Sequence, residues 1–259
     1  MSRIYVFTAM KIEAESILEV VRGKGTGQIH ARNVSFHTGS NDLHLILSGM
    51  GPQKAKESAT DALSPWLQNS GRSVDVPHEK PDFVLVTGLC GGLTQHVREC
   101  DLVVYENCVS GEMKLTCSAS RKITELLTCH GIGHRVADGI TSPRIATNRA
   151  EREALSRSAV AVVDTETYEI LSLAARAGIP TAVLRVVSDS IDRDLPNFNQ
   201  ALNAQGDLDG RKALGIALGS PLRTLRLMAA NKRALRQLTQ ALRVVLNADW
   251  PMINQACGA

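Results

Sequence analysis

The chain has 259 residues, 44% of them hydrophobic and 21% charged, so it is long enough to bury one sizeable core. It has no uninterrupted apolar window of about 18 residues, which argues against a transmembrane helix. Its N-terminal segment carries charges where a signal peptide requires an apolar stretch, so we expect a cytoplasmic protein. The six cysteines are irregularly spaced, and we expect reduced, mostly buried thiols rather than a disulfide framework or a zinc site.

The charges are distributed unevenly along the chain. The formal net charge is +3, from 29 Lys and Arg against 26 Asp and Glu. Residues 210–248 contain eight basic residues and no acidic ones, which leaves the other 220 residues with a net charge of −5. We therefore expect a mildly acidic body with a basic C-terminal extension.

Short apolar runs alternate with segments of helical periodicity, a pattern typical of a βα protein with a mostly parallel sheet. The first part of the chain predicts, in order, a strand at 4–7, a helix in which Ile12, Ile17, Val20 and Val21 fall close to helical spacing, strands at 34–37 and 43–47, a helix at 53–67 and a strand at 83–86. The polar segment 68–82 is expected to be an exposed loop. The next part predicts a strand at 102–109, a helix at 121–129, a strand at 160–163, a helix at 168–177 that ends at Gly178, and a strand at 181–187.

Four of these strands are followed directly by residues suited to chemistry. Glu13 follows the first strand, the glycine-rich segment 88–92 follows the strand at 83–86, and Glu166 and Asp189 follow the strands at 160–163 and 181–187. Ligands of open α/β sheets bind beyond the carboxyl ends of the strands. We therefore expect the three carboxylates to converge beside the glycine segment, which we interpret either as a ligand-binding turn or as a tight strand-to-helix connection.

A set of carboxylates suits cleavage of a glycosidic bond better than phosphoryl transfer, which requires Lys, Arg or a metal at the same place. A carboxylate can accept hydrogen bonds from both hydroxyls of a diol, and a buried acid with a raised pKa can protonate a leaving group. Taken one at a time, each acid is more often a helix cap, so the prediction depends on the three together. Neither a Walker motif nor a GxGxxG fingerprint is present, and the histidines lack metal-ligand spacing, so we expect no metal and no cofactor.

Five segments carry a resemblance to a known family: VFTAMKIEAE at 6–15, SGMGPQKA at 48–55, LVTGLCGGL at 85–93, VVDTETYEI at 162–170 and LRVVSDSID at 184–192. In order and spacing they resemble the motifs of the nucleoside phosphorylase and nucleosidase superfamily. The resemblance implies a three-layer α/β fold with a central mixed, partly barrel-like sheet flanked by helices. It also implies a catalytic domain over 1–195, followed by a basic, amphipathic helical extension over 196–259 packed on it.

The resemblance also assigns roles by position. Glu13 matches an acid that activates the attacking water, and Glu166 matches a carboxylate that holds the ribose hydroxyls. Asp189, with Ser188 beside it, matches the residue that protonates the imidazole-ring nitrogen of the purine. The remaining substrate-binding positions are Met10, Gly88, Leu89, Gly91 and Thr165.

The chain departs from the family pattern where phosphate is usually bound. The hexameric purine phosphorylases that it resembles place an Arg and a Ser or Thr at the positions of Val86 and Leu89, and a glycine at the position of Thr8. Thr165 replaces the usual Met between the family's two acids. Water and inorganic phosphate therefore both stay open as the nucleophile, and Arg144 is either a substitute phosphate ligand or, more commonly for such a residue, an exposed surface arginine.

One branch shares the sequences GLCGGL and VDTET and the C-terminal extension: the hopanoid-associated phosphorylases, thought to remove adenine from adenosylhopane. This resemblance implies an adenine nucleoside or a nucleoside-bearing lipid as substrate. The alternatives are a small-molecule methylthioadenosine or adenosylhomocysteine nucleosidase and a non-catalytic nucleoside-binding protein. The relatives lead us to expect a homodimer, and the 3% aromatic content gives little basis for nucleic-acid binding.

The extension predicts an amphipathic helix with Ser220 as its cap and Pro221 at its first position. At 100° per residue, its apolar residues fall within an arc of about 100°: Leu227, Met228, Leu235, Leu238, Leu242, Val245 and Leu246. Basic residues lie on the opposite side: Arg226, Lys232, Arg233, Arg236 and Arg243. The helix either packs on the domain with its basic side in water, or attaches the protein to the anionic inner surface of the membrane.

Overall fold

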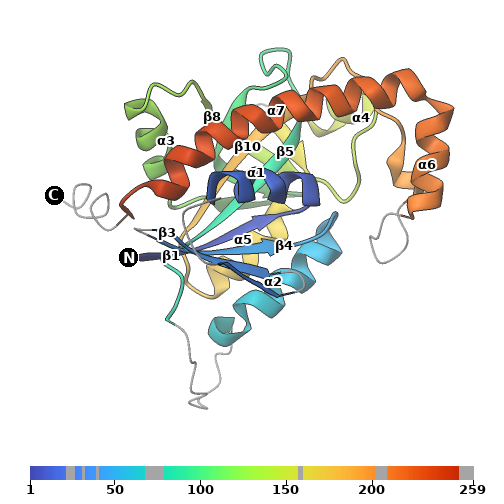
Figure 1. Ribbon diagram of the computed structural model, residues 1–259. Helices are drawn as coiled ribbons and strands as arrows, with labels where there is room; N and C mark the ends of the chain where they lie inside the picture. Colours follow the sequence, from blue (N-terminus) through green and yellow to red (C-terminus); the bar gives the residue numbers. More distant parts are fainter. Residues whose placement is uncertain are drawn as a thin grey trace.

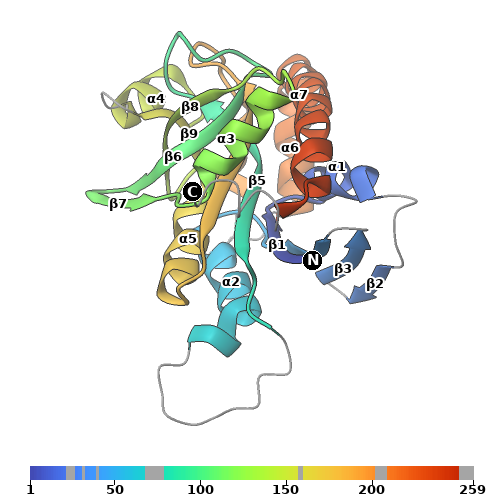
Figure 2. The same ribbon diagram turned by 90° about the vertical axis from the view of Figure 1, so that its left-hand side faces the viewer.

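The computed structural model describes residues 1–21, 27–30, 33–38, 41–67, 79–156, 160–201 and 209–250. These residues form three layers, with helices on both sides of one large sheet (Figure 1). Helices α1 (Lys11–Val21) and α7 (Pro221–Asn247) cover one face of the sheet. Helices α2 (Pro52–Leu67) and α5 (Thr167–Arg176) pack against each other on the other face (Figure 2).

The described strands belong to a single ten-stranded sheet. In chain order they are β1 (Ser2–Thr8), β2 (Gly27–His30), β3 (Asn33–Thr38), β4 (Asn41–Leu47), β5 (Phe83–Gly92), β6 (Leu102–Ser110), β7 (Met113–Thr116), β8 (Arg135–Thr141), β9 (Val160–Asp164) and β10 (Thr181–Asp189). The remaining helices are α3 (Ser120–Cys129), α4 (Arg149–Leu155), the short 3-10 helix η1 (Phe198–Ala201) and α6 (Gly210–Gly219).

Five of the strands close into a ring. β5 pairs with β10, β10 with β6, β6 with β8, β8 with β9, and β9 pairs back with β5. The sheet then continues outward from β5 through β1, β4 and β3 to β2, while β7 pairs with β6. Parallel and antiparallel pairs both occur, so the predicted α/β architecture with a mixed, partly barrel-like sheet is confirmed.

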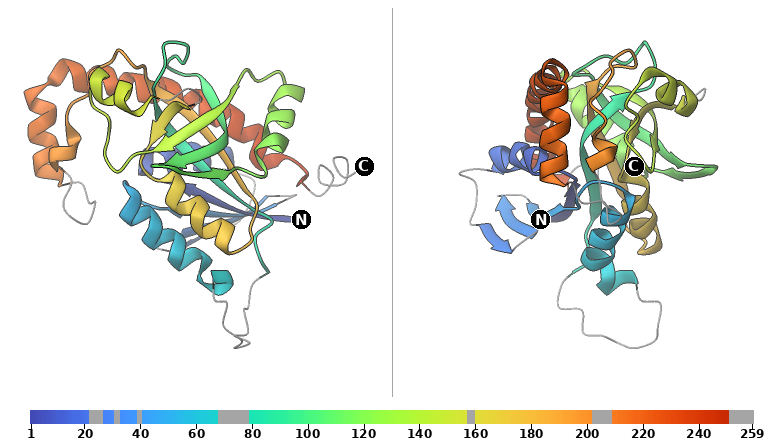
Figure 3. Two further views of the ribbon diagram at one scale, coloured as in Figure 1. Left: turned by 180° about the vertical axis from the view of Figure 1, so that it is seen from behind. Right: turned by 90° about the vertical axis from the view of Figure 1, so that its right-hand side faces the viewer.

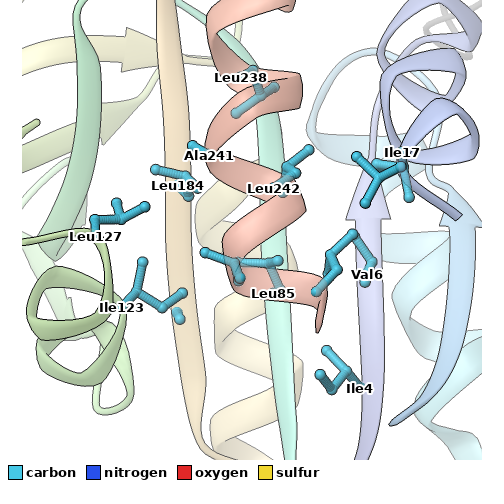
Figure 4. Packing of buried hydrophobic residues seen from close by; sticks show 14 of the residues in the cluster. Ile4, Val6, Ile17, Leu85, Ile123, Leu127, Leu184, Leu238, Ala241 and Leu242 are labelled. Carbon is cyan, nitrogen blue, oxygen red and sulfur yellow. The ribbon is translucent and has the colours of Figure 1, made fainter. Parts of the chain in front are cut away.

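Helix α7 is part of the main hydrophobic core. Leu238, Ala241 and Leu242 are fully buried and lie over β5 and β10 (Figure 4). Leu85 and Leu184 supply the opposing apolar surface from these two strands, in one cluster of buried residues with α7 (Figure 4). The second half of α7 thus has the apolar side that its periodicity predicts, and it packs on the sheet.

The sequence-based expectation for residues 88–92 was wrong in one respect. The glycine-rich segment does not turn into a helix but continues β5 as far as Gly92. Gly91 and Gly92 pair with Val163 and Val162 of β9, so the segment closes the strand ring. Small residues serve here because the backbones and side chains of neighbouring strands approach closely.

Two single-residue expectations also differ from the structure. Ser220 stands at the N-cap of α7 without a capping side-chain hydrogen bond, although Pro221 does occupy the first turn. Met228 was expected on the buried side of α7 but is 64% exposed. Most of the predicted loop, residues 68–78, lies outside the described residues.

Candidate active site

The carboxyl ends of β1, β5, β9 and β10 surround a cavity of about 290 Å³, the carboxylate cavity. Eight of the nine residues proposed from sequence line it: Met10, Glu13, Leu89, Gly91, Thr165, Glu166, Ser188 and Asp189. The three carboxylates that the sequence places at separate strand ends are therefore brought together, and each residue is at most 5% exposed. The ninth residue, Gly88, lies behind Glu13 rather than on the cavity wall.

Glu13 is held in place by four hydrogen-bond donors. Its Oε2 accepts bonds from the Thr8 hydroxyl at 2.9 Å and from the backbone N–H groups of Ala9 at 3.0 Å and Met10 at 2.8 Å. Its Oε1 accepts a bond from the Leu89 N–H at 2.7 Å. All four partners donate, so the carboxyl group of Glu13 acts toward them as an acceptor through both of its oxygens.

Position 88 has space only for a glycine. A Cβ atom there would lie 2.5 Å from Glu13 Oε1 and 3.0 Å from Nη1 of Arg185. The backbone also has a φ of +141°, which side chains rarely tolerate. Glycine at this position therefore lets Glu13 approach β5.

Glu166 is held from two directions. Its Oε1 accepts hydrogen bonds from the N–H of Gly51, at 2.9 Å, and from the Thr165 hydroxyl, and its Oε2 lies 3.7 Å from Arg185 Nη2. Burial raises the pKa of Glu166, and the nearby guanidinium of Arg185 opposes this shift. Arg185 thus favours the charged, hydrogen-bond-accepting form that could hold hydroxyl groups.

Asp164 orients the turn that presents Glu166. Its Oδ1 accepts the N–H groups of Glu166 and Thr167 at 3.1 and 2.8 Å, at the start of α5. Its Oδ2 accepts the hydroxyl of Tyr105 at 2.9 Å. Asp164 therefore fixes the turn that leads into α5, and both it and Glu166 line the cavity.

Asp189 is buried beside a buried arginine of α4. Its Oδ1 accepts the Ser188 hydroxyl, and its Oδ2 lies 2.5 Å from Arg152 Nη2. This close ion pair holds Oδ2 against the guanidinium of Arg152. Burial raises the pKa of Asp189, and Arg152 acts against that shift. A buried carboxyl group with a raised pKa can take up a proton and pass it to a ligand.

Arg152 also connects Asp189 to the backbone of Ala146, which lines the same cavity. Its side chain donates to the carbonyl oxygens of Ala146, at 3.3 Å, and of Ser190. Its helix is capped by Asn148, whose side chain accepts the N–H of Glu151 at 3.0 Å. The placement of Arg152 is therefore set by a well-defined helix start.

Two charged residues of the site were missed from sequence. Arg185 interrupts the apolar run of β10, and a lone charge in a buried strand requires a buried partner, so the signal was present. Arg152 lies in a segment with Arg149, Glu151 and Glu153, which resembles an exposed helix surface and gave no signal. Both are 1% exposed and supply the positive charge around the carboxylates.

The cavity wall has few groups for a phosphate ion. Val86 is buried in the core, and the Thr8 hydroxyl is bonded to Glu13. Among the described residues, Arg144 is the one basic side chain on the wall, and it also lines a second cavity of about 890 Å³. The described residues contain no cluster of His, Cys, Asp and Glu side chains that could hold a metal ion.

Several solved structures share this fold. Futalosine hydrolase of Helicobacter pylori is 15% identical, with a TM-score of 0.70 over 95% of this chain and 97% of that one. The 5'-methylthioadenosine/S-adenosyl homocysteine nucleosidase of Helicobacter pylori is 14% identical, with a TM-score of 0.70 over 95% and 98%. The corresponding nucleosidase of Neisseria meningitidis, solved with methylthio-immucillin-A, is 14% identical, with a TM-score of 0.69 over 95% and 99%.

A match to a family sequence model identifies the family, whereas structural similarity at such low identity shows only the fold. No curated protein matches the chain as a sequence relative. The family model described as the phosphorylase superfamily matches residues 3–208. This match spans more than half of the chain and includes every residue of the carboxylate cavity named above. The chain belongs to the phosphorylase superfamily.

Proposed function

We propose that this protein cleaves the N-glycosidic bond of an adenine nucleoside and releases the free base. The observation that carries the proposal is the convergence of Glu13, Glu166 and Asp189 on one cavity, each buried and each in a different electrostatic setting. Cleavage of this bond passes through an oxocarbenium-like state, which nearby negative charge stabilises and protonation of the leaving base promotes. The proposed chemistry needs only water or inorganic phosphate as co-substrate.

Asp189 is the proposed acid. Its raised pKa makes a proton available, which the carboxyl group would give to the imidazole-ring nitrogen of the purine. The Ser188 hydroxyl holds Oδ1 of Asp189. A neutral base leaves more readily than an anionic one, so this proton transfer lowers the barrier to bond cleavage.

Glu166 and Glu13 are proposed to act on the ribose side. Glu166 would accept hydrogen bonds from the ribose hydroxyls, in competition with the Thr165 hydroxyl that now contacts it. Glu13, fixed by four donors, would place negative charge beside the developing cation and orient the nucleophile. We propose water as that nucleophile, because Val86 is in the core and Thr8 is bonded to Glu13.

The group attached to ribose is proposed to be apolar. Around the carboxylates the cavity is lined by Met10, Met50, Leu195, Phe198 and Leu227. Such a wall suits a nucleoside-bearing lipid such as adenosylhopane, which we propose as the substrate class. It also suits a methylthio group, so a methylthioadenosine nucleosidase is the second candidate, and the fold shared with such nucleosidases supports it.

Adenine release from a panel of nucleosides, assayed with and without phosphate, tests the proposal. We expect release without phosphate and with the greatest kcat/KM for substrates with apolar substituents. Asp189→Asn should lower kcat by about 10²–10⁴-fold, while Asp194→Asn, a half-exposed aspartate nearby, should leave it unchanged. Nucleoside binding without any release would instead identify a non-catalytic binding protein, and full activity of Asp189→Asn would exclude the role given to Asp189.

A further inference from the structure

The first half of α7 and the preceding helix α6 expose large apolar side chains. Among the described residues nine such side chains are exposed, and five of them fall within 15 residues: Leu214, Leu218, Leu222, Leu225 and Met228, each 60–71% exposed. We call these five residues the α6–α7 surface. Clustered exposed apolar side chains mark contact sites more often than isolated ones do.

The exposure has a structural cause. Ala234, Leu238 and Leu242, in the second half of α7, face the sheet and are buried. At 100° per residue, Leu222 and Leu225 fall on the opposite side of the helix from these residues. Near its start, α7 also lies at an edge of the molecule, where α6 is attached (Figure 1; Figure 3). The leucines thus point away from the body and have no described core residue to pack against.

Basic residues accompany this surface, and no acidic residue lies between 210 and 248. Three basic side chains of α7 pair with carboxylates of the body: Arg223 with Asp194 at 3.7 Å, Arg233 with Glu99 at 3.3 Å and Arg243 with Glu19 at 2.8 Å. The other five basic residues of α6 and α7 form no ion pair with any described residue: Arg211, Lys212, Arg226, Lys232 and Arg236. Exposed leucines are therefore combined with uncompensated positive charge.

We propose that the α6–α7 surface docks onto an anionic lipid membrane. Apolar side chains flanked by Lys and Arg suit the boundary between headgroups and acyl chains, where both kinds of side chain are satisfied. A second copy of this chain is the less suitable occupant, because pairing two such surfaces would bring like charges together. No described helix has the length and hydropathy needed to cross a membrane.

Docking in this way would place the carboxylate cavity near the membrane. Leu227 and Asn231 line that cavity and lie on the same helix as Leu225 and Met228. The two cavity residues fall on the opposite side of α7 from Leu222 and Leu225, so the helix would lie between the membrane and the cavity. The docking inference itself does not rest on the proposed function, since it concerns side chains outside the cavity.

Co-sedimentation of the whole protein with vesicles tests the proposal. We expect binding to phosphatidylcholine vesicles that contain phosphatidylglycerol, weak binding to pure phosphatidylcholine, and release as the salt concentration rises. The double variant Arg226→Gln/Lys232→Gln should bind anionic vesicles roughly 25-fold more weakly, because each charge contributes about fivefold. Leu222→Gln/Leu225→Gln should weaken binding at least about tenfold.

Controls of the same chemistry are available elsewhere on the surface. Lys56→Gln/Arg176→Gln removes two exposed cations, and Met113→Gln/Val136→Gln removes two exposed apolar side chains. Both should bind like the unaltered chain, and all four variants should keep the same melting temperature and the same activity on a water-soluble nucleoside.

Three results would overturn the proposal. The first is no sedimentation of the unaltered chain with anionic vesicles at low salt. The second is an equal loss of binding in the control variants. The third is sedimentation velocity showing a dimer that the leucine variant dissociates while vesicle binding stays unchanged, which would assign the surface to a second copy of the chain.

Discussion

The carboxylate of Glu13 lies directly against the backbone of Gly88. In Gly88→Ala the new Cβ would overlap Oε1, 2.5 Å away, and the strained φ of +141° would add to the cost. We expect a loss of about 1–3 kcal/mol of unfolding free energy and at least a tenfold loss of kcat/KM, because Glu13 must move. Gly131 has a φ of +67° and open space around it, so Gly131→Ala should lower stability but leave kcat/KM unchanged. Normal kcat/KM in Gly88→Ala would show that the position of Glu13 is unimportant.

The positive charge of Arg152 lowers the pKa of Asp189, the proposed acid. Asp189 must be protonated to act, so activity is lost as the pH rises through its pKa, which burial raises above the usual value and Arg152 holds down. Arg152→Met removes the guanidinium, so the loss of kcat/KM at high pH should occur about 1–3 pH units higher than in the unaltered chain.

A smaller effect is expected from a more distant charge. Arg193 also lowers the pKa of Asp189, but it is partly exposed and paired with Glu99 at 2.6 Å. Arg193→Met should shift the loss of kcat/KM at high pH by much less than Arg152→Met. If Arg152→Met lowered activity equally at every pH, Arg152 would be a structural residue only.

At the scale of elements, the far end of α7 is fastened by a residue of another element. Asn41, at the start of β4, donates from Nδ2 to the carbonyl oxygens of Leu246 at 3.1 Å and Ala248 at 2.9 Å. The last carbonyls of a helix have no partner within the helix, so these bonds satisfy groups that would otherwise be buried without one.

Loss of this contact should loosen the end of α7. Asn41→Ala should lower the free energy of unfolding in urea by about 1–3 kcal/mol. Hydrogen exchange should speed up at the C-terminal turn of α7 more than in β10. Asn247→Ala, a less buried change on the same helix, should stay within about 0.5 kcal/mol of the unaltered chain. An equal effect of both substitutions would contradict the fastening role of Asn41.

The elements also show what the sequence can and cannot predict. Apolar runs and their ends place Glu13, Glu166 and Asp189 correctly, since parallel strands bring their carboxyl ends together. Residues 88–92 were misassigned because glycines permit either a turn or a strand with close neighbours. The burial of Arg152 depends on how α4 sits against β10, which no local pattern encodes. Likewise, periodicity alone does not reveal that α7 extends beyond the sheet and leaves Met228 exposed.

At the scale of the whole molecule, the reactivity of the cysteines depends on how deeply each thiol is buried. Cys90, Cys108 and Cys117 are buried in the core cluster of the strand ring, while Cys129, at the end of α3, is exposed. Burial raises the pKa of all three inner thiols, that of Cys117 to about 12, so little reactive thiolate is present at neutral pH. Three of the five described cysteines are buried, as the prediction of mostly buried thiols requires.

Thiol alkylation followed peptide by peptide should therefore separate these residues. We expect Cys129 to react at close to the rate of a free thiol, and the three inner cysteines to react at least about 10³-fold more slowly, since a reagent must wait for the structure to open. Adding urea should accelerate the three inner sites with a common denaturant dependence, because they belong to one cluster that unfolds together. Cys129→Ser should remove the fast peptide and leave the other rates unchanged. Fast labelling of Cys108 in the native protein would show that the strand ring opens separately from the rest of the molecule.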